Sequence, residues 1–153
     1  MRSKFLLTAV FFSAVLYSCK KDKTAPVSAQ TLMLLQNKWA LVSEVTVVPT
    51  QPTYNTTYTG APTDYYLFST EDTLFVHKRS PVYSYMLPIT DTLPYSVRND
   101  HTLAYGPNTN VEIIIEKLTT DSLILNNPVT VSFVNVDNSV TSYSGTKTIT
   151  LAR

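Results

Sequence analysis

The chain is poor in the residues that most catalytic and metal sites require. It has one cysteine, Cys19, so it forms no internal disulfide and no cysteine-based zinc or redox pair. Three glycines, at positions 60, 106 and 145, are too few and too scattered for a phosphate-binding loop. The two histidines, His77 and His101, lack the spacing of known metal motifs. We therefore expect neither a cofactor nor a metal, and a protein that is not an enzyme.

Long apolar runs are also scarce, and the only one lies near the start of the chain. Phe5 to Leu16 is apolar except for Thr8 and Ser13, and it follows the positive charges of Arg2 and Lys4. The run is too short to span a bilayer stably, and the small Ser18 comes shortly after it. Residues 1–18 are therefore expected to be a cleaved export signal.

The segment Leu16-Tyr17-Ser18-Cys19 resembles the bacterial lipobox, in which an aliphatic residue and a small residue precede a cysteine. The resemblance implies that Cys19 is diacylated, becomes the new N-terminus and is then N-acylated, and several acyl chains together anchor a protein stably. Lys20 follows the cysteine where Asp would retain a lipoprotein in the inner membrane, so the resemblance implies the outer membrane. The periplasmic and surface faces of that membrane stay open. The alternative is an ordinary signal peptide with an incidental cysteine.

Charge gives little indication of a partner. Without Arg2 and Lys4 the net charge of the chain falls from +1 to −1, since 10 basic residues then face 11 acidic ones. Three of those bases lie at positions 20, 21 and 23, next to the expected anchor. No basic face for a nucleic acid is present, and residues 19–28 are interpreted as a lipidated, solvated tether.

The rest of the chain, residues 29–153, has the composition of a single all-β domain. Ser28 is expected to cap a short helix over 29–36, with an apolar side made by Leu32, Met33 and Leu35. After it, Thr, Val, Tyr and Ile dominate short runs separated by turn residues. The expected strands are 39–48, 65–69, 74–78, 82–87, 93–98, 101–105, 111–118, 122–125, 129–136 and 140–151.

Such a series of strands favours an antiparallel up-and-down β-barrel of about eight strands, with a two-sheet β-sandwich as the alternative. A closed barrel leaves no edge strand exposed to aggregation. In the run 111–116 the residues Val111, Ile113 and Ile115 share one face while Glu112 and Glu116 share the other. One apolar and one polar face are expected in either architecture.

Several segments are similar to bacterial lipocalin-like domains. The run 34–43, with its Asn-Lys-Trp, resembles the opening strand of that family, although Asn37 replaces the usual glycine. The aromatic strand around Tyr65, the late hairpin 111–125 and the final strand ending at Arg153 resemble later parts of the family. The resemblance implies a lipocalin-like barrel, and large buried aromatics dominate core energetics, so Trp39 is expected to plug one end of it.

Tyrosine is abundant, with ten residues in the chain. Six of them are candidates for a ligand site at the barrel mouth: Tyr54, Tyr58, Tyr65, Tyr66, Tyr83 and Tyr85. They cluster in and after the segment 49–63, where lipocalin-like barrels carry a flap over the mouth. The other interpretation is that these tyrosines are β-formers on a half-buried surface.

We therefore expect an outer-membrane lipocalin-like lipoprotein that binds a small hydrophobic or amphipathic ligand. The alternative is a non-enzymatic surface module with a solid core that binds protein or glycan. Paired carboxylates do not favour a glycosidase, because Glu112 and Glu116 lie about 13 Å apart along a strand. The oligomeric state is not indicated.

The anchor prediction can be tested by replacing Cys19 with alanine. Because the acyl chains would have no attachment site, Cys19→Ala should abolish incorporation of labelled palmitate and move the protein out of the membrane fraction. Ser18→Ala, which keeps a small residue before the cysteine, is the matched control. Membrane association that survives Cys19→Ala without acylation would contradict the lipoprotein interpretation.

Overall fold

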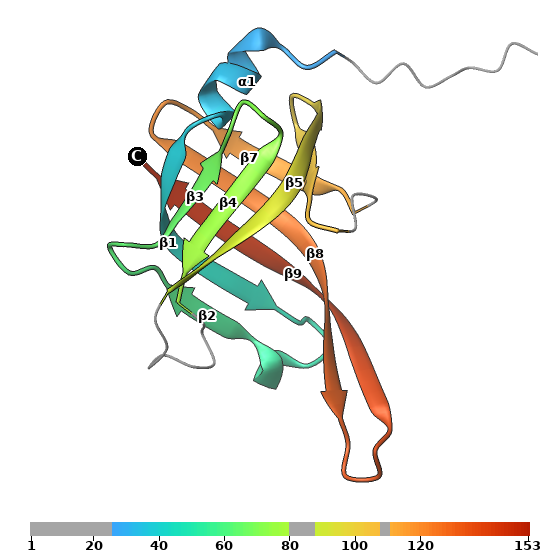
Figure 1. The fold of residues 1–153 in the computed structure, drawn as a ribbon. Helices are drawn as coiled ribbons and strands as arrows, with labels where there is room; N and C mark the ends of the chain where they lie inside the picture. The colour runs from blue at the N-terminus through green and yellow to red at the C-terminus, as the bar shows by residue number, and fades with distance from the viewer. Residues whose placement is uncertain (1–25, 80–87, 108–110) are drawn as a thin grey trace, which may run out of the picture.

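The computed structural model describes residues 26–79, 88–107 and 111–153, and Figure 1 shows their arrangement. The described chain forms one helix, α1 (Ala29–Leu35), one short 3-10 helix, η1 (Pro52–Tyr54), and nine strands. The strands are β1 (Lys38–Val47), β2 (Thr56–Thr59), β3 (Tyr65–Phe68), β4 (Thr73–Lys78), β5 (Ile89–Asn99), β6 (Thr102–Tyr105), β7 (Ile113–Leu118), β8 (Ser122–Val134) and β9 (Val140–Ala152). The expected signal peptide, Cys19 and the expected strand 82–87 lie outside the described residues.

The strands form a closed antiparallel barrel of lipocalin-like architecture. Eight strands, β1 and β3 to β9, each pair with the next along the chain, and β2 is an additional strand on β1. The barrel closes where β1 pairs with β9, from Ala40 opposite Ala152 to Val47 opposite Thr146. The prediction of an up-and-down barrel with a short N-terminal helix is confirmed, and the sandwich alternative is not the observed architecture.

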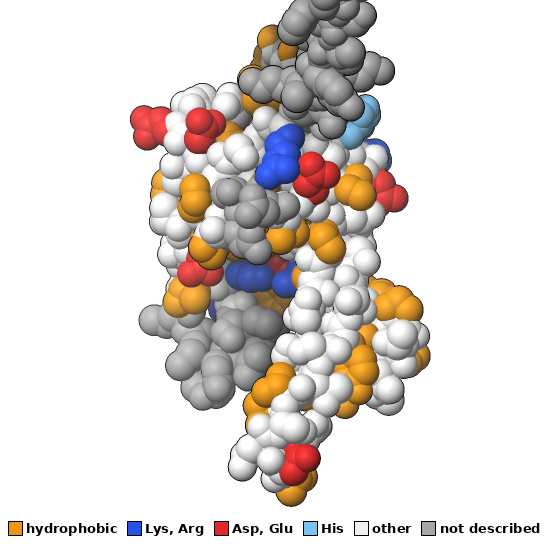
Figure 2. All heavy atoms as spheres, turned by 90° about the vertical axis from the view of Figure 1, so that its right-hand side faces the viewer, with side chains coloured by type: hydrophobic (Ala, Val, Ile, Leu, Met, Phe, Trp, Pro, Cys, Tyr) orange, Lys and Arg blue, Asp and Glu red, His pale blue; other side chains and the backbone are white. Residues whose placement is uncertain are grey.

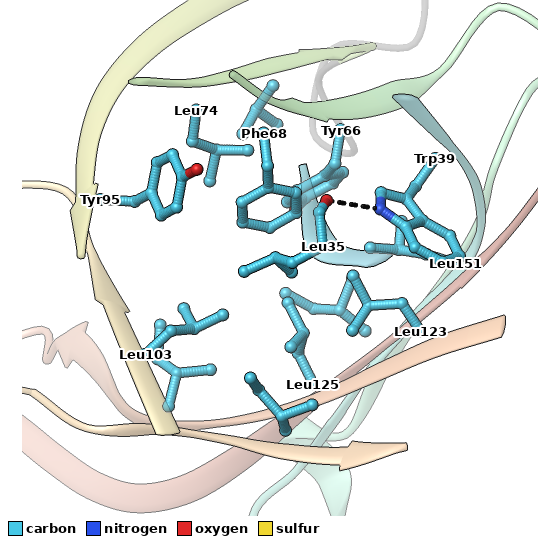
Figure 3. Close-up of a cluster of buried hydrophobic side chains, with 14 of the residues drawn as sticks. Leu35, Trp39, Tyr66, Phe68, Leu74, Tyr95, Leu103, Leu123, Leu125 and Leu151 are labelled. Carbon is cyan, nitrogen blue, oxygen red and sulfur yellow. Dashed lines mark hydrogen bonds between the residues drawn. The ribbon is translucent and has the colours of Figure 1, made fainter. Parts of the chain in front are cut away.

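Helix α1 covers one end of the barrel, which we call the helix end. Its first turn is capped as predicted, because the Ser28 hydroxyl accepts a hydrogen bond from the backbone N–H of Thr31. Trp39 is fully buried below the helix and donates from its indole N–H to the Leu35 carbonyl at 3.0 Å (Figure 3). The Arg153 guanidinium lies 4.3 Å from the centroid of the Trp39 ring. Met33, predicted to belong to the apolar side, is instead 68% exposed.

The helix-end half of the interior is filled by apolar side chains (Figure 3). They come from α1 and from every strand of the barrel, so each strand contributes to one continuous core. The labelled members of this cluster in Figure 3 are Leu35, Trp39, Tyr66, Phe68, Leu74, Tyr95, Leu103, Leu123, Leu125 and Leu151.

Strand β1 contains a β-bulge that changes which side chains face inward. Its register against β9 shifts between Leu41 and Ser43, so Val42 is the extra residue. Gly60 lies against the bulge and donates to the Val42 carbonyl at 2.9 Å. A Cβ atom on Gly60 would lie 1.8 Å from the Leu41 carbonyl oxygen, so the close approach requires glycine there. Beyond the bulge the buried residues of β1 are even-numbered, beginning with Glu44.

The last hairpin extends beyond the barrel (Figure 1). We call its outer part, residues 128–134 and 140–145, the ribbon. The sequence predicted two strands, 122–125 and 129–136, but β8 is continuous through Pro128, which pairs with Thr146. Proline is tolerated there because β7 ends its pairing opposite Asn126, which leaves the outer edge of β8 without a strand partner among the described residues.

The connection after β1 also differs from its prediction as a loop. The expected flap segment, 49–63, contains η1 and then β2, which pairs with β1 from Thr46 opposite Thr56 to Ser43 opposite Thr59. The ring of Tyr54 stacks on Phe133 of the ribbon, with ring centroids 3.9 Å apart. Threonine is a good strand former, and a partner strand beside it makes that preference effective.

Trp39→Ala should destabilise the barrel, because the truncation leaves a cavity in the helix-end core and removes the indole hydrogen bond to Leu35. We expect the free energy of unfolding in urea to fall by about 3–5 kcal/mol. Met33→Ala, at an exposed position of the same helix end, should change it by less than about 0.5 kcal/mol. Equal stabilities for Trp39→Ala and the wild type would exclude a core role for Trp39.

Candidate functional site

A charged cluster lies inside the barrel at the end opposite to α1, which we call the mouth. At its centre is Glu44, whose side chain is only 6% exposed. Its carboxylate accepts two hydrogen bonds from the Lys78 ammonium, at 2.6 and 2.7 Å, and one from the Tyr66 hydroxyl at 2.6 Å. The Lys147 ammonium lies 3.7 Å from Oε2 of the same carboxylate. Two cations and one buried tyrosine therefore surround a single carboxylate.

The surroundings of Glu44 favour its ionised form. Burial alone would raise the pKa of this carboxyl group, but the hydrogen bonds from Lys78 and Tyr66 and the charges of both lysines outweigh it. The net result is a pKa below the ordinary value. Burial, together with the nearby Tyr105 and Glu44, raises the pKa of Tyr66, which therefore stays a hydrogen-bond donor. The cluster is thus a stable arrangement of an ionised carboxylate and its donors.

A second polar contact extends the cluster toward β2. The hydroxyl of Tyr58 donates to Oδ2 of Asp64, which also accepts the backbone N–H of Ala61 at 2.9 Å. Burial and the Asp64 carboxylate raise the pKa of Tyr58 to about 12. Asp64 is almost completely buried, and its Oδ1 has no hydrogen-bond partner within the described part of the chain. The Lys78 ammonium lies 6.0 Å from the centroid of the Tyr58 ring, which connects the two polar contacts.

A small pocket of about 90 Å³ opens beside Glu44. Its walls are Glu44, Thr46, Thr56, Thr57, Tyr58 and Lys147, so hydroxyl and charged groups lie beside the apolar parts of these side chains. The pocket is much smaller than a site that encloses a drug-sized ligand, which takes about 300–1,000 Å³. It has room for the polar end of a ligand, while the apolar core fills the barrel below it.

The structure places four of the six candidate tyrosines, and only two of them lie at the charged cluster. Tyr58 and Tyr66 belong to the charged cluster at the mouth. Tyr54 lies against the ribbon, whereas Tyr65 lies on the outer side of the barrel, with its ring stacked on His77 at 5.0 Å. The remaining candidates, Tyr83 and Tyr85, lie outside the described residues. Trp39 lies at the helix end, opposite Tyr66 in the pairing of β1 with β3, and no hydrogen bond joins its side chain to Glu44 among the described residues.

A larger, polar groove of about 340 Å³ lies at the helix end, between α1 and the turn that joins β5 to β6. Asp100 lines it and accepts the backbone N–H of Ser28 at 2.7 Å, so its carboxylate holds the start of the helix. His101 and Glu116 also line the groove. In the described ranges no three His, Cys, Asp or Glu side chains gather closely enough to hold a metal ion.

The central residues of the mouth were not predicted from the sequence. Alternation from Trp39 along an unbroken strand would place Glu44 on the outside, and the bulge at Val42 reverses this. Lys78 and Lys147 are distant from Glu44 in the sequence. Lys78 is brought to it by the pairing of β1, β3 and β4, and Lys147 by the pairing of β1 with β9 that closes the barrel. The one local signal was Gly60, a lone glycine in a strand-forming region, which is typical of a bulge or a close backbone contact.

Comparisons with protein-family models, with curated proteins and with solved structures found no match to this chain. Among the described residues no helix is long and apolar enough to cross a membrane, since α1 has only seven residues.

Glu44→Gln should destabilise the protein strongly near neutral pH, because the partly buried Lys78 ammonium would lose its carboxylate. We expect a loss of about 3 kcal/mol in the free energy of unfolding at pH 7. Since the pKa of Glu44 is lower in the folded than in the unfolded chain, its contribution is present above the unfolded value of about 4.3. That contribution disappears as the pH falls through the folded pKa, so the two proteins should converge in acid.

Urea unfolding of the wild type and of Glu44→Gln between pH 7 and pH 3 measures this convergence. Glu112→Gln is the matched control, since Glu112 is exposed and pairs with Arg98 at the surface. It should change stability little at any pH. A difference between the wild type and Glu44→Gln that stayed constant over the whole range would contradict the proposed ionisation of Glu44.

Proposed function

We propose that this protein is a lipid-anchored lipoprotein of the outer membrane whose barrel mouth binds a small amphipathic ligand. The observation that carries the proposal is the charged cluster of Glu44, Lys78 and Lys147 beside a pocket inside the barrel. The barrel is a non-enzymatic scaffold in this proposal, and the ligand contacts it through hydrogen bonds and apolar surface alone.

The cluster supports binding because apolar side chains could fill the same part of the barrel without the free-energy cost of burying charges. A buried ion pair is often no more stabilising than apolar side chains of the same volume, so packing alone gives no reason to place Glu44 there. Perturbed ionisable groups in a concave site are typical of functional sites, although structural networks also perturb pKa values. The pocket next to Glu44 makes the functional interpretation the stronger one.

The packing of the core limits where a ligand sits. The helix-end half of the interior is filled by the apolar cluster around Trp39 and Phe68, whose side chains are fully buried. A ligand therefore lies in the mouth and along neighbouring surface, with its polar part in the pocket. This favours an amphipathic molecule over a wholly hydrophobic one, because the pocket walls carry hydroxyl and charged groups.

The arrangement of the two ends agrees with a membrane anchor. The described chain enters the barrel beside α1, and the mouth and ribbon lie at the opposite end (Figure 1). A tether attached through Cys19 would therefore hold the helix end toward the membrane. The mouth would then face away from the bilayer and stay open to a ligand.

A second candidate is an interaction module, and the ribbon favours it. Between Pro128 and Gly145 the only charged side chain is Asp137, and Figure 2 shows a surface of mainly uncharged and hydrophobic groups there. Near the tip, Val134, Val136 and Val140 are 72%, 106% and 64% exposed. Exposed aliphatic residues on a projecting hairpin are suited to contact with a protein partner.

Ligand binding can be tested on a chain that starts at residue 20, since every strand of the barrel lies between residues 38 and 152. Purified gently from a periplasmic extract, this protein should show in native mass spectrometry a reproducible extra mass that organic extraction removes. Lys147→Gln, which removes a charged side chain from the pocket wall, should carry less of that mass. If the protein carries no extra mass and does not bind added fatty acids, lipids or sugars, the ligand proposal is excluded and the interaction module is favoured.

A further inference from the structure

We infer that the ligand of the mouth has a small anionic head group, and that Lys147 is the residue that selects it. The inference rests on the proposed function and names the class of ligand for the same site. It is carried by the way the charges of the mouth are paired, because two ammonium groups share the single carboxylate of Glu44.

Hydrogen bonds from Lys78 and Tyr66 already occupy three of the roughly four acceptor positions of the Glu44 carboxylate. Oε1 accepts from both Lys78 and Tyr66, and Oε2 accepts from Lys78. Lys78 thus neutralises Glu44 through two short charge-assisted hydrogen bonds. A cationic ligand would therefore have to compete with Lys78 for this carboxylate. Asp64 does not line the pocket, and its unpaired oxygen Oδ1 is buried, so it offers no acceptor to a ligand there.

Lys147 is the cation that makes no hydrogen bond to Glu44. Its ammonium lies 3.7 Å from Glu44, beyond hydrogen-bonding distance, and its side chain is 32% exposed. Its donors are therefore available to a ligand in the pocket, which it lines. Asp91, on β5 near this end, is exposed, so solvent and salt screen its charge.

Lys147 also stands in a polar row that crosses the mouth. Thr46 of β1 pairs with Thr56 of β2 on one side and with Lys147 of β9 on the other, and Lys147 in turn pairs with Asn127 of β8. The row offers an ammonium, two hydroxyls and an amide at one level of the barrel. A pocket of about 90 Å³ has the volume of roughly three water molecules, which suits a carboxylate or a phosphate group.

The apolar part of the ligand has a surface directly beyond this row. Val129 and Val131 follow Asn127 on the same face of β8, since alternate residues of a strand share a face. Both are partly exposed, and Tyr143 of β9 pairs with Val131. A single hydrocarbon chain can therefore leave the pocket along the inner face of the ribbon.

The test is calorimetric titration of the chain from residue 20 with four ten-carbon amphiphiles, each below its micelle concentration. They are decanoate, decyl phosphate, decanol and decylamine, which share an unbranched ten-carbon skeleton and carry different head groups. Decanoate or decyl phosphate should bind the wild type at least about tenfold more tightly than decylamine, and the tighter of the two identifies the anion. Lys147→Gln should remove this advantage and its dependence on salt, whereas Lys147→Arg should keep both.

Lys117→Gln is the matched control, since it removes an exposed lysine from β7 outside the mouth. It should bind decanoate as the wild type does. Equal binding of decylamine and decanoate, or undiminished decanoate binding by a folded Lys147→Gln, would overturn this inference and leave the proposed function standing. Failure of all four compounds to bind would overturn both.

Discussion

Strand β1 is paired along both of its edges, and the other features of the structure depend on this. One edge pairs with β9 and closes the barrel, and the other pairs first with β3 and then with β2. An edge strand exposes unpaired backbone groups that invite aggregation, and closure removes that hazard from the barrel. Closure also encloses an interior. The side chains that fill it come from strands as far apart in the sequence as β1 and β9, where Ala40 lies opposite Ala152.

The bulge at Val42 divides that interior into two chemically different halves. Before the bulge, β1 contributes Trp39 and Leu41 to the apolar core, and after it the strand contributes Glu44 and Thr46 to the mouth. The shift depends on the close approach of Gly60, where a larger residue would collide with the backbone of Leu41. A bulge that re-aims side chains beside a functional site is a common device in β-proteins. Here it converts what alternation would make an exposed glutamate into the centre of a buried ion cluster.

Much of the fold could be predicted because its signals are local. Ser28 is a good helix cap. The acidic residues Glu71 and Asp72 form a turn between the strands that were expected at 65–69 and 74–78, with Asp72 at a positive φ. The merger of 122–125 and 129–136 into β8 could not be predicted, because Pro128 usually interrupts a strand. It is tolerated only where the neighbouring strand β7 has already ended. The threonines of β2 likewise became a strand only because β1 offered them an edge.

The sequence by itself determined the all-β composition, most of the strand segments and the helix cap, since these depend on residues close together in the chain. The lipoprotein interpretation rests on the sequence alone and stays a proposal. It also pointed to tyrosines near the mouth, of which Tyr58 and Tyr66 contact the charged cluster. Only the tertiary structure decided that Glu44, Lys78 and Lys147 meet, and that Tyr65 lies outside the barrel. The physical reason is that a single bulge moves the side chain of every later residue in β1 to the other side of the sheet. The pairing of distant strands, including the pairing of β1 with β9 that closes the barrel, then decides which side chains come close to Glu44.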